Sequence, residues 1–157
     1  APQFTGVELP AEAVVKLALH GNIIGIKESG GDVNKIARMV RETPDDFQVL
    51  SGSANSFLSA LEVGAVGGIM ALANIASGPL ADLMHYFQEG DVERAAQIQR
   101  KLIVPNDAVT AKFGVAGLKA ALDMLGDYGG SVRSPLLSLT YSERNELRVI
   151  MEAGGLL

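Results

Sequence analysis

The sequence predicts an α/β protein, with parallel strands in the first half of the chain and helices alone in the second. Three short, mostly apolar runs at residues 23–26, 47–51 and 65–72 are each bounded by turn residues, as buried parallel strands are. Stretches with helical spacing of apolar residues separate them, and this alternation is typical of right-handed parallel crossovers. The expected organisation is therefore an α/β part at residues 1–76 and a helical part at residues 77–157.

Composition excludes several classes of function. The 157 residues are 48% hydrophobic, which suits a domain with a sizeable core. The net charge is −5 and no Lys/Arg-rich block occurs, so a nucleic-acid partner is not expected. The longest nearly apolar stretch, residues 64–76, is too short and glycine-rich to span a membrane, so a membrane partner is not expected either. The chain has no cysteine and only two distant histidines, which predicts neither disulfides nor a metal site.

The first helix and strand lead to a lysine. Residues 1–9 are expected to form a loop before a helix at residues 11–19, which Gly21 can end. The strand at residues 23–26 then ends at Lys27.

Two further strand and helix patterns follow. Asp32 can cap a helix whose apolar residues recur at i, i+3, i+4 and i+7. The strand at residues 47–51 precedes a short helix that Gly64 can end. The third strand, at residues 65–72, is expected to continue to Asn74.

The second half carries helix starts and stops but no strand pattern. Ser77, Asp91 and Ser142 can each begin a helix, and a further helix is expected at residues 116–125. Pro105 is expected to end the second of these helices and to separate it from the next segment.

Three parallel strands with covering helices allow two architectures. A small open sheet would leave two unpaired edges, which natural proteins usually cover. A barrel closed by further strands would have no edges. The residues by themselves leave both architectures open.

Lys27 is the candidate nucleophile, because the carboxyl ends of parallel strands are where α/β proteins place reactive groups. An amine attacks a carbonyl only when it is unprotonated, and burial at the end of an apolar strand would disfavour the ammonium form. The resulting imine acts as an electron sink for making or breaking a carbon–carbon bond. The alternative is a solvated lysine at a strand end, paired with Glu28.

The turn at residues 29–32 is a candidate anion site, because its backbone N–H groups precede a helix. A substrate carboxylate could bind there, with the Ser29 hydroxyl as a further donor; the alternative is an ordinary glycine turn. Gly52 follows the second strand as Ser29 follows the first, and its small size would leave room for a ligand. Ile69, in the third strand, is expected in the core from the pattern alone.

The segment Gly25-Ile-Lys27-Glu-Ser29-Gly-Gly-Asp32 resembles the Schiff-base lysine motif of the dihydrodipicolinate synthase/N-acetylneuraminate lyase family of class I aldolases. The resemblance covers nearly the whole chain and continues through residues 50–53, 64–69, 73–74, 113–119 and 128–136. Within the family, residues 30–33, 46–50, 66–68 and 71–74 look closest to 4-hydroxy-2-oxoglutarate aldolase.

The resemblance implies a (β/α)₈ TIM barrel with a C-terminal helical extension, usually assembled as a homotetramer. Residues 1–76 would supply its sixth to eighth strands. Lys27 would be the Schiff-base residue, Ser29 and Gly52 would contact the substrate, and Ile69 would offer a backbone contact near the bound keto acid.

The implied reaction is reversible cleavage of a 2-oxo acid, such as 4-hydroxy-2-oxoglutarate to pyruvate and glyoxylate, without a metal or organic cofactor. The alternative within the family is a dihydrodipicolinate synthase-type condensation of pyruvate with an aldehyde. An alternative of another class is a non-catalytic half-barrel that binds an anion or serves in assembly.

The chain also departs from the family pattern. Mapped onto the family, it begins just before the sixth strand, so an N-terminal half is expected to supply five strands, a carboxylate-binding hydroxyl pair and a proton-shuttling tyrosine. The tyrosines present, Tyr86, Tyr128 and Tyr141, match no such position. Activity is expected to require that half, and the compartment is left as cytoplasmic or mitochondrial.

Overall fold

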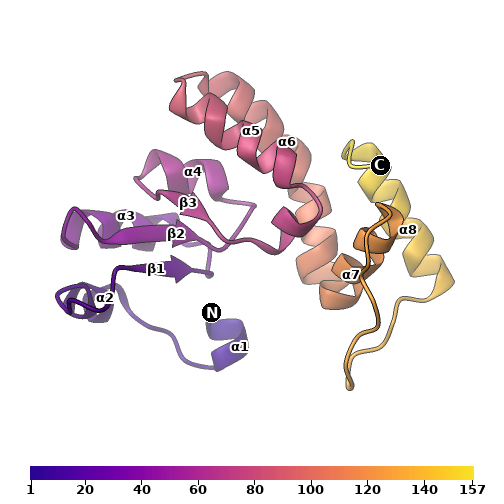
Figure 1. Ribbon diagram of the computed structural model, residues 1–157, viewed down its shortest axis with the longest axis horizontal. Coiled ribbons are helices and arrows are strands. Elements are labelled where there is room, and N and C mark those ends of the chain that lie inside the picture. Colours follow the sequence, from indigo (N-terminus) through magenta and orange to yellow (C-terminus); the bar gives the residue numbers. More distant parts are fainter. The chain divides into compact units, whose positions relative to one another are not determined.

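The computed structural model describes residues 1–157, which form two compact units, Ala1–Met70 and Ala71–Leu157 (Figure 1). The sequence pattern predicts this division after residue 76. Each unit is described by itself.

The first unit contains a three-stranded parallel sheet. Its strands are β1 (Gly25–Glu28), β2 (Gln48–Ser51) and β3 (Gly67–Gly68), and they lie side by side in chain order. In the register of β1 and β2, Lys27 is opposite Leu50. The predicted α/β pattern with parallel strands is therefore confirmed.

Four helices accompany this sheet: α1 (Pro2–Thr5), α2 (Ala11–Leu17), α3 (Val33–Glu42) and α4 (Phe57–Glu62). Asp32 caps α3 as predicted, because its carboxylate accepts hydrogen bonds from the N–H groups of Asn34 and Lys35, at 2.9 and 3.1 Å. This cap fixes where the chain turns from the end of β1 into the helix.

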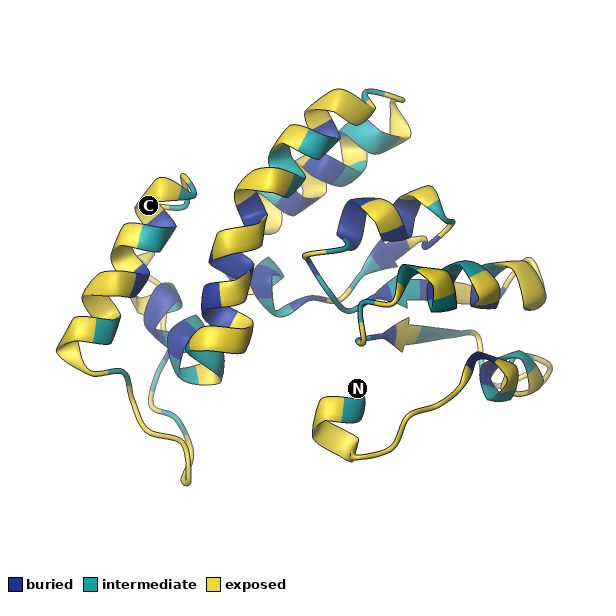
Figure 2. Ribbon diagram, turned by 180° about the vertical axis from the view of Figure 1, so that it is seen from behind, coloured by how far each residue is buried: buried dark blue, intermediate teal, exposed yellow.

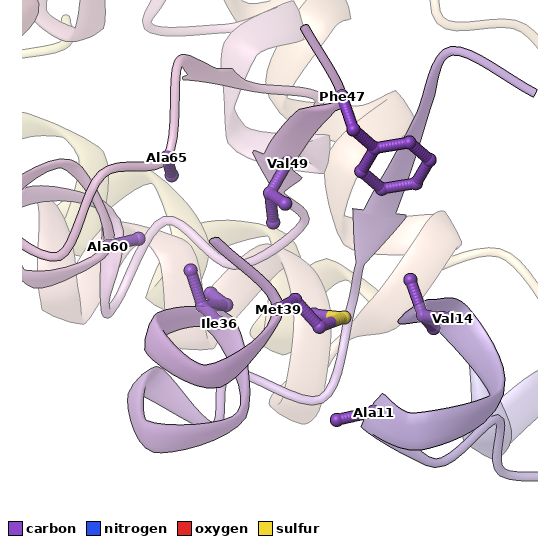
Figure 3. Packing of buried hydrophobic residues seen from close by; sticks show 8 residues of the cluster. All are labelled: Ala11, Val14, Ile36, Met39, Phe47, Val49, Ala60 and Ala65. Carbon is purple, nitrogen blue, oxygen red and sulfur yellow. The ribbon is translucent and has the colours of Figure 1, made fainter. Parts of the chain in front are cut away.

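The core of the first unit lies between the helices and one face of the sheet. Its buried members come from α2, α3, β2 and the segments around α4: Ala11, Val14, Ile36, Met39, Phe47, Val49, Ala60 and Ala65 (Figure 3). Along α3, buried residues alternate with exposed ones at helical spacing, so only one side of this helix is packed (Figure 2). Along β2, Val49 is buried whereas the next residue, Leu50, is partly exposed. One face of the sheet thus carries the core, and no member of that core cluster lies on the other, uncovered face.

Three local predictions in this unit are wrong. The first segment contains the helical turn α1 where a loop was expected. Strand β1 begins at Gly25 instead of Ile23 and ends at Glu28, one residue past Lys27, because its ladder with β2 continues to the pair Glu28 and Ser51. Strand β3 is only two glycines long, since residues without side chains contribute no packing to hold a longer strand. The expected continuation to Asn74 is instead a 3₁₀ helix, η1 (Ala71–Asn74), which begins the second unit.

The second unit is helical, as predicted. Its helices are α5 (Ser77–Gln88), α6 (Val92–Asp107), α7 (Gly114–Met124) and α8 (Tyr141–Ala153), with a π-helix, η2 (Ala108–Lys112), between α6 and α7. Helices α5 and α6 lie side by side as an antiparallel pair (Figure 1). Leu83, Leu102, Leu147 and Met151 are fully buried within this unit and form much of its core.

The helix boundaries of the second unit correct two predictions. Pro105 lies inside α6 instead of ending it; the helix continues to Asp107 and then widens into the π-helix. Helix α8 is capped by Thr140, because its hydroxyl accepts from the N–H of Glu143 and the Glu143 carboxylate accepts from the N–H of Thr140. This reciprocal capping box explains why the helix starts before Ser142. None of the helices combines the length and apolar character that a membrane-spanning segment needs.

Candidate functional site

Lys27 lies on the uncovered face of the sheet, opposite the core cluster. Its strand neighbour Glu28 is buried on the helix side, and because successive side chains in a strand alternate, Lys27 points to the opposite face. Lys27 is exposed, so the predicted burial of this side chain is wrong for the chain as described. The alternative pairing with Glu28 is also wrong, because the Glu28 carboxylate pairs with Lys35. The Lys27 amine is left without an ion pair.

The strand ladders continue one residue beyond the ends of β1, β2 and β3. The N–H of Gly52 donates to the carbonyl oxygen of Glu28 at 2.6 Å, and the N–H of Ile69 donates to that of Ser51 at 2.8 Å. With side chains alternating, Ser29, Gly52 and Ile69 therefore follow two residues after Lys27, Leu50 and Gly67 on the same face. The structure thus brings all four predicted site residues to one face, at the carboxyl ends of the strands.

Gly52 permits a close approach between the ends of β1 and β2. A Cβ atom at this position would lie 2.5 Å from the Ser29 Oγ and 2.8 Å from the carbonyl oxygen of Glu28. The space beside Gly52 is therefore filled by Ser29, and the expectation that it is free for a ligand is wrong. A glycine here sets the position of the Ser29 hydroxyl.

Ile69 presents its side chain to solvent. It is 55% exposed, so the core position that its pattern predicts is wrong, whereas its backbone N–H is held by Ser51. Ile69 thus adds an apolar side chain to the uncovered face.

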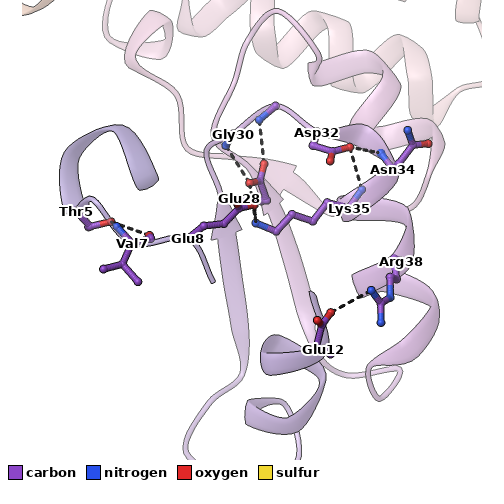
Figure 4. Close-up of polar contacts among 11 residues, drawn as sticks. Thr5, Val7, Glu8, Glu12, Glu28, Gly30, Asp32, Asn34, Lys35 and Arg38 are labelled. Atoms are coloured by element: carbon purple, nitrogen blue, oxygen red, sulfur yellow. Dashed lines mark hydrogen bonds and ion pairs between the residues drawn. The ribbon is translucent and has the colours of Figure 1, made fainter. Parts of the chain in front are cut away.

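The turn after Lys27 is closed by a carboxylate from the chain itself (Figure 4). Glu28 is 5% exposed and accepts hydrogen bonds from the N–H groups of Gly30, at 2.9 Å, and Gly31, at 3.0 Å. Lys35 lies 3.6 Å from the same carboxylate. The prediction that these N–H groups are available for an external anion is therefore wrong.

Sequence reasoning missed the role of Glu28. The signal was an acidic residue two positions before a Gly-Gly pair, close enough for its side chain to reach back to the turn. Lys35 was equally missed; it bridges Glu28 and, at 3.3 Å, Glu8 in the first segment.

A shallow hollow of about 50 Å³ opens beside these residues. Its lining comes from both sides of β1, with Lys27 and Ser29 on one and Glu28 and Lys35 on the other, and from the first segment. Ligand pockets for small molecules typically enclose roughly 300–1,000 Å³, so this hollow is much smaller than such a pocket. No group of three or more His, Cys, Asp or Glu side chains is placed to hold a metal ion anywhere in residues 1–157.

Comparison with known proteins gives this edge of the sheet a context. The dihydrodipicolinate synthetase family model matches residues 1–154. The chain belongs to the dihydrodipicolinate synthetase family. The 4-hydroxy-tetrahydrodipicolinate synthase of Listeria monocytogenes is 34% identical over 146 residues, which are 93% of this chain and 50% of that protein. The 4-hydroxy-tetrahydrodipicolinate synthase 1 of Halalkalibacterium halodurans is 35% identical over 148 residues, or 94% of this chain and 50% of that protein.

A solved structure agrees with the family assignment. The crystal structure of a dihydrodipicolinate synthase from Bacillus anthracis superimposes with a TM-score of 0.91 at 33% identity, covering 96% of this chain and 52% of that one. The chain thus spans about half the length of the relatives it matches. The prediction of a partial TIM barrel, with about three parallel strands and their helices, is confirmed.

Proposed function

We propose that the full-length protein is a lysine-dependent lyase that condenses pyruvate with an aldehyde, with Lys27 as the Schiff-base residue. The position of Lys27 carries this proposal: it is an unpaired amine on the uncovered face of the sheet, beside the carboxyl ends of the strands. The names of the relatives, which are synthases of 4-hydroxy-tetrahydrodipicolinate, favour condensation over cleavage.

In the proposed reaction the unprotonated amine of Lys27 attacks the keto carbon of pyruvate. Loss of water gives an imine, and removal of a proton from the adjacent methyl carbon gives an enamine. The enamine carbon then attacks the aldehyde carbon, which forms the new carbon–carbon bond. Hydrolysis of the imine releases the product and restores the amine. Ser29, whose Oγ lies beside Gly52, and the backbone near Ile69 are proposed to contact the bound keto acid.

Borohydride trapping tests the proposal directly. The full-length protein is incubated with pyruvate, reduced with borohydride and digested, and the modified lysine is found by mass spectrometry. We expect one adduct, on Lys27, and none in Lys27→Arg. Lys35→Arg is the matched control, because it changes the other lysine of the hollow and should leave the adduct on Lys27. An unmodified Lys27 in the folded full-length protein would refute the proposal.

A second candidate is reversible cleavage of 4-hydroxy-2-oxoglutarate to pyruvate and glyoxylate. The observation in its favour is the likeness of residues 30–33, 46–50, 66–68 and 71–74 to 4-hydroxy-2-oxoglutarate aldolase. Both reactions pass through the same imine on Lys27, so trapping does not separate them. The two reactions are separated by comparing two rates. One is the release of pyruvate from 4-hydroxy-2-oxoglutarate, and the other is the consumption of pyruvate in the presence of a panel of other aldehydes.

A non-catalytic, anion-binding function has less support. The two glycine N–H groups that would hold the anion already bind Glu28, and the N–H groups of Asn34 and Lys35 bind Asp32. This function predicts carboxylate or phosphate binding that survives Lys27→Ala. Calorimetric titration of that variant with pyruvate and with inorganic phosphate distinguishes it from imine formation.

The proposed assembly follows the family resemblance. We propose a homotetramer of the full-length protein, in the cytoplasm or the mitochondrion, with no nucleic-acid or membrane partner. Sedimentation equilibrium and microscopy of the tagged full-length protein test these two points. A monomer at micromolar concentration would contradict the first.

A further inference from the structure

The proposed reaction makes no use of the most deeply buried ionisable side chain beside Lys27. Glu28 follows Lys27 in β1 and is 5% exposed. A carboxylate removed from water costs free energy unless its oxygens are paired and hydrogen-bonded. The contacts of Glu28 therefore indicate what its burial achieves.

Glu28 ties the end of β1 to three other parts of the first unit. Its Oε1 accepts from the N–H of Gly30 at 2.9 Å and its Oε2 from that of Gly31 at 3.0 Å. The Nζ of Lys35, in the first turn of α3, lies 3.6 Å from Oε1. On the main chain, its carbonyl oxygen accepts from Gly52 at 2.6 Å. One residue thus links β1, its own turn, α3 and the end of β2.

The two glycines have the conformation and size that this arrangement needs. A Cβ atom on Gly30 would lie 2.9 Å from the Glu28 Oε1, and Gly31 has a φ of +75°, which favours glycine. Glycine is otherwise the most flexible residue, so the turn would be loose without a partner. The buried carboxylate supplies that partner, and Ser29 lies between two residues that are both held.

The partner of the Glu28 charge is as informative as its hydrogen bonds. The Lys35 ammonium, whose side chain is 13% exposed, lies on the helix side of the sheet with Glu28. Lys27 points to the opposite face and makes no ion pair. The acidic neighbour of the nucleophile is thus neutralised by another lysine, and the Lys27 amine stays available.

We propose that Glu28 is a positioning residue for the Schiff-base site: its carboxylate fixes the Gly30–Gly31 turn and so holds Lys27 and Ser29 in the geometry that imine formation requires. This inference rests on the proposed function of Lys27. Attack on a carbonyl depends on alignment, and misplacement by about 1 Å can cost roughly 10²-fold in rate. Freeing the turn should therefore slow the chemistry while Lys27 itself is unchanged.

The test compares rates of imine formation in the full-length protein. Glu28→Gln keeps the size of the side chain but leaves one acceptor oxygen in place of two, so the amide NH₂ group faces one of the donors. We expect the single-turnover rate of borohydride-trappable imine with saturating pyruvate to fall by roughly ten- to a hundredfold. The amount finally trapped per folded molecule should equal that of the wild type. A purely structural role would lower the folded fraction and leave the rate per folded molecule unchanged.

Three further variants complete the design. Lys35→Met removes the ammonium but keeps both glycine hydrogen bonds, so a smaller fall in rate is expected. Glu28→Asp keeps the charge one methylene further from the turn, and should trap imine at a rate between Glu28→Gln and the wild type. Glu42→Gln is the matched control, because it also removes an ion-paired carboxylate but at the far end of α3; it should leave the rate unchanged.

The outcomes separate this inference from the proposed function. A wild-type protein without a trapped pyruvate adduct on Lys27 overturns the proposed function, and the positioning role of Glu28 with it. If the wild type forms the adduct, and Glu28→Gln and Glu28→Asp form it at the wild-type rate per folded molecule, the positioning role alone is overturned. A fall in Glu42→Gln as large as that in Glu28→Gln also overturns it, because the effect would then be a general one of lost charge.

Discussion

The two faces of the sheet in the first unit differ in how many of their side chains are buried or paired within this chain. On the helix side, Ile36 and Met39 are completely buried, and the only buried carboxylate, Glu28, has three partners. On the other side, Lys27 is exposed without an ion pair, Leu50 is partly exposed and Ile69 is 55% exposed. The helix side is thus buried and paired, whereas the uncovered face presents an amine, a hydroxyl and apolar groups.

This difference indicates that stability and chemistry are divided between the faces. Substitutions on the helix side should act on folding, and those on the uncovered face should act on imine formation. Substitutions of Glu28 or Gly52 should affect both folding and imine formation, since each residue contacts the turn that carries Ser29. The predictions below test this division.

The largest expected effect is complete loss of the adduct in Lys27→Met. The thioether cannot form an imine, so no pyruvate should be trapped by the full-length protein. Because the side chain is exposed and unpaired, the free energy of unfolding should change by no more than about 0.5 kcal/mol. Trapping and urea unfolding of the same preparation measure both. A large loss of stability together with retained trapping would break the division between the faces.

On the helix side, Ile36→Ala should destabilise the protein by about 2–5 kcal/mol, because it opens a cavity at a completely buried position. Ile69→Ala is the matched control on the uncovered face, and should change the stability of the 157-residue chain by no more than about 0.5 kcal/mol. Urea unfolding of the three chains gives the comparison. Equal losses for the two variants would contradict it.

The helix side was also the more predictable one from sequence. The cap at Asp32 and the packed stripe that includes Ile36 follow from local rules, and the structure has both. The existence of the third strand was predicted, but its extent could not be, because Gly67 and Gly68 have no side chains whose pattern could reveal where the ladder ends.

The candidate site was predictable in its members but not in its contacts. Lys27, Ser29, Gly52 and Ile69 follow or end strands, and parallel order brings such positions to one edge. The closure of the Gly30–Gly31 turn by Glu28 had a local signal in the sequence. The pairing of Glu28 with Lys35 instead of Lys27, and the packing of Gly52 on Ser29, had none. These contacts depend on side-chain directions that no spacing rule supplies.

At the meeting point of the two faces, Gly52→Ala should cost about 1–3 kcal/mol, because its methyl group would overlap the Ser29 Oγ and the Glu28 carbonyl oxygen. It should also slow imine trapping in the full-length protein, since Ser29 must move. Gly78→Ala is the control, because a Cβ atom there meets nothing within 4 Å. Unfolding and trapping are measured on both variants. If Gly52→Ala behaved like Gly78→Ala in both, the proposed role of Gly52 in placing Ser29 would be wrong.

The smallest effect is expected on the solvent side of α3, where Glu42 pairs with arginines. A hydrogen bond from Arg41, and then one from Arg38, lower the pKa of the Glu42 carboxyl from its usual value of 4.5. Because the folded-state pKa lies below the unfolded one, the stabilisation is complete above the unfolded-state pKa and is lost as the pH falls through the folded-state pKa.

The stability difference between wild type and Glu42→Gln should therefore be present at neutral pH and vanish in acid. It should also shrink in about 1 M salt, since both partners are in solvent and exposed ion pairs are screened. Urea unfolding across a pH series measures the difference, and one that did not depend on pH would show that the pair contributes through packing alone. In either case imine trapping should be unaffected, because this exposed pair at the far end of α3 has no contact with the turn that carries Ser29.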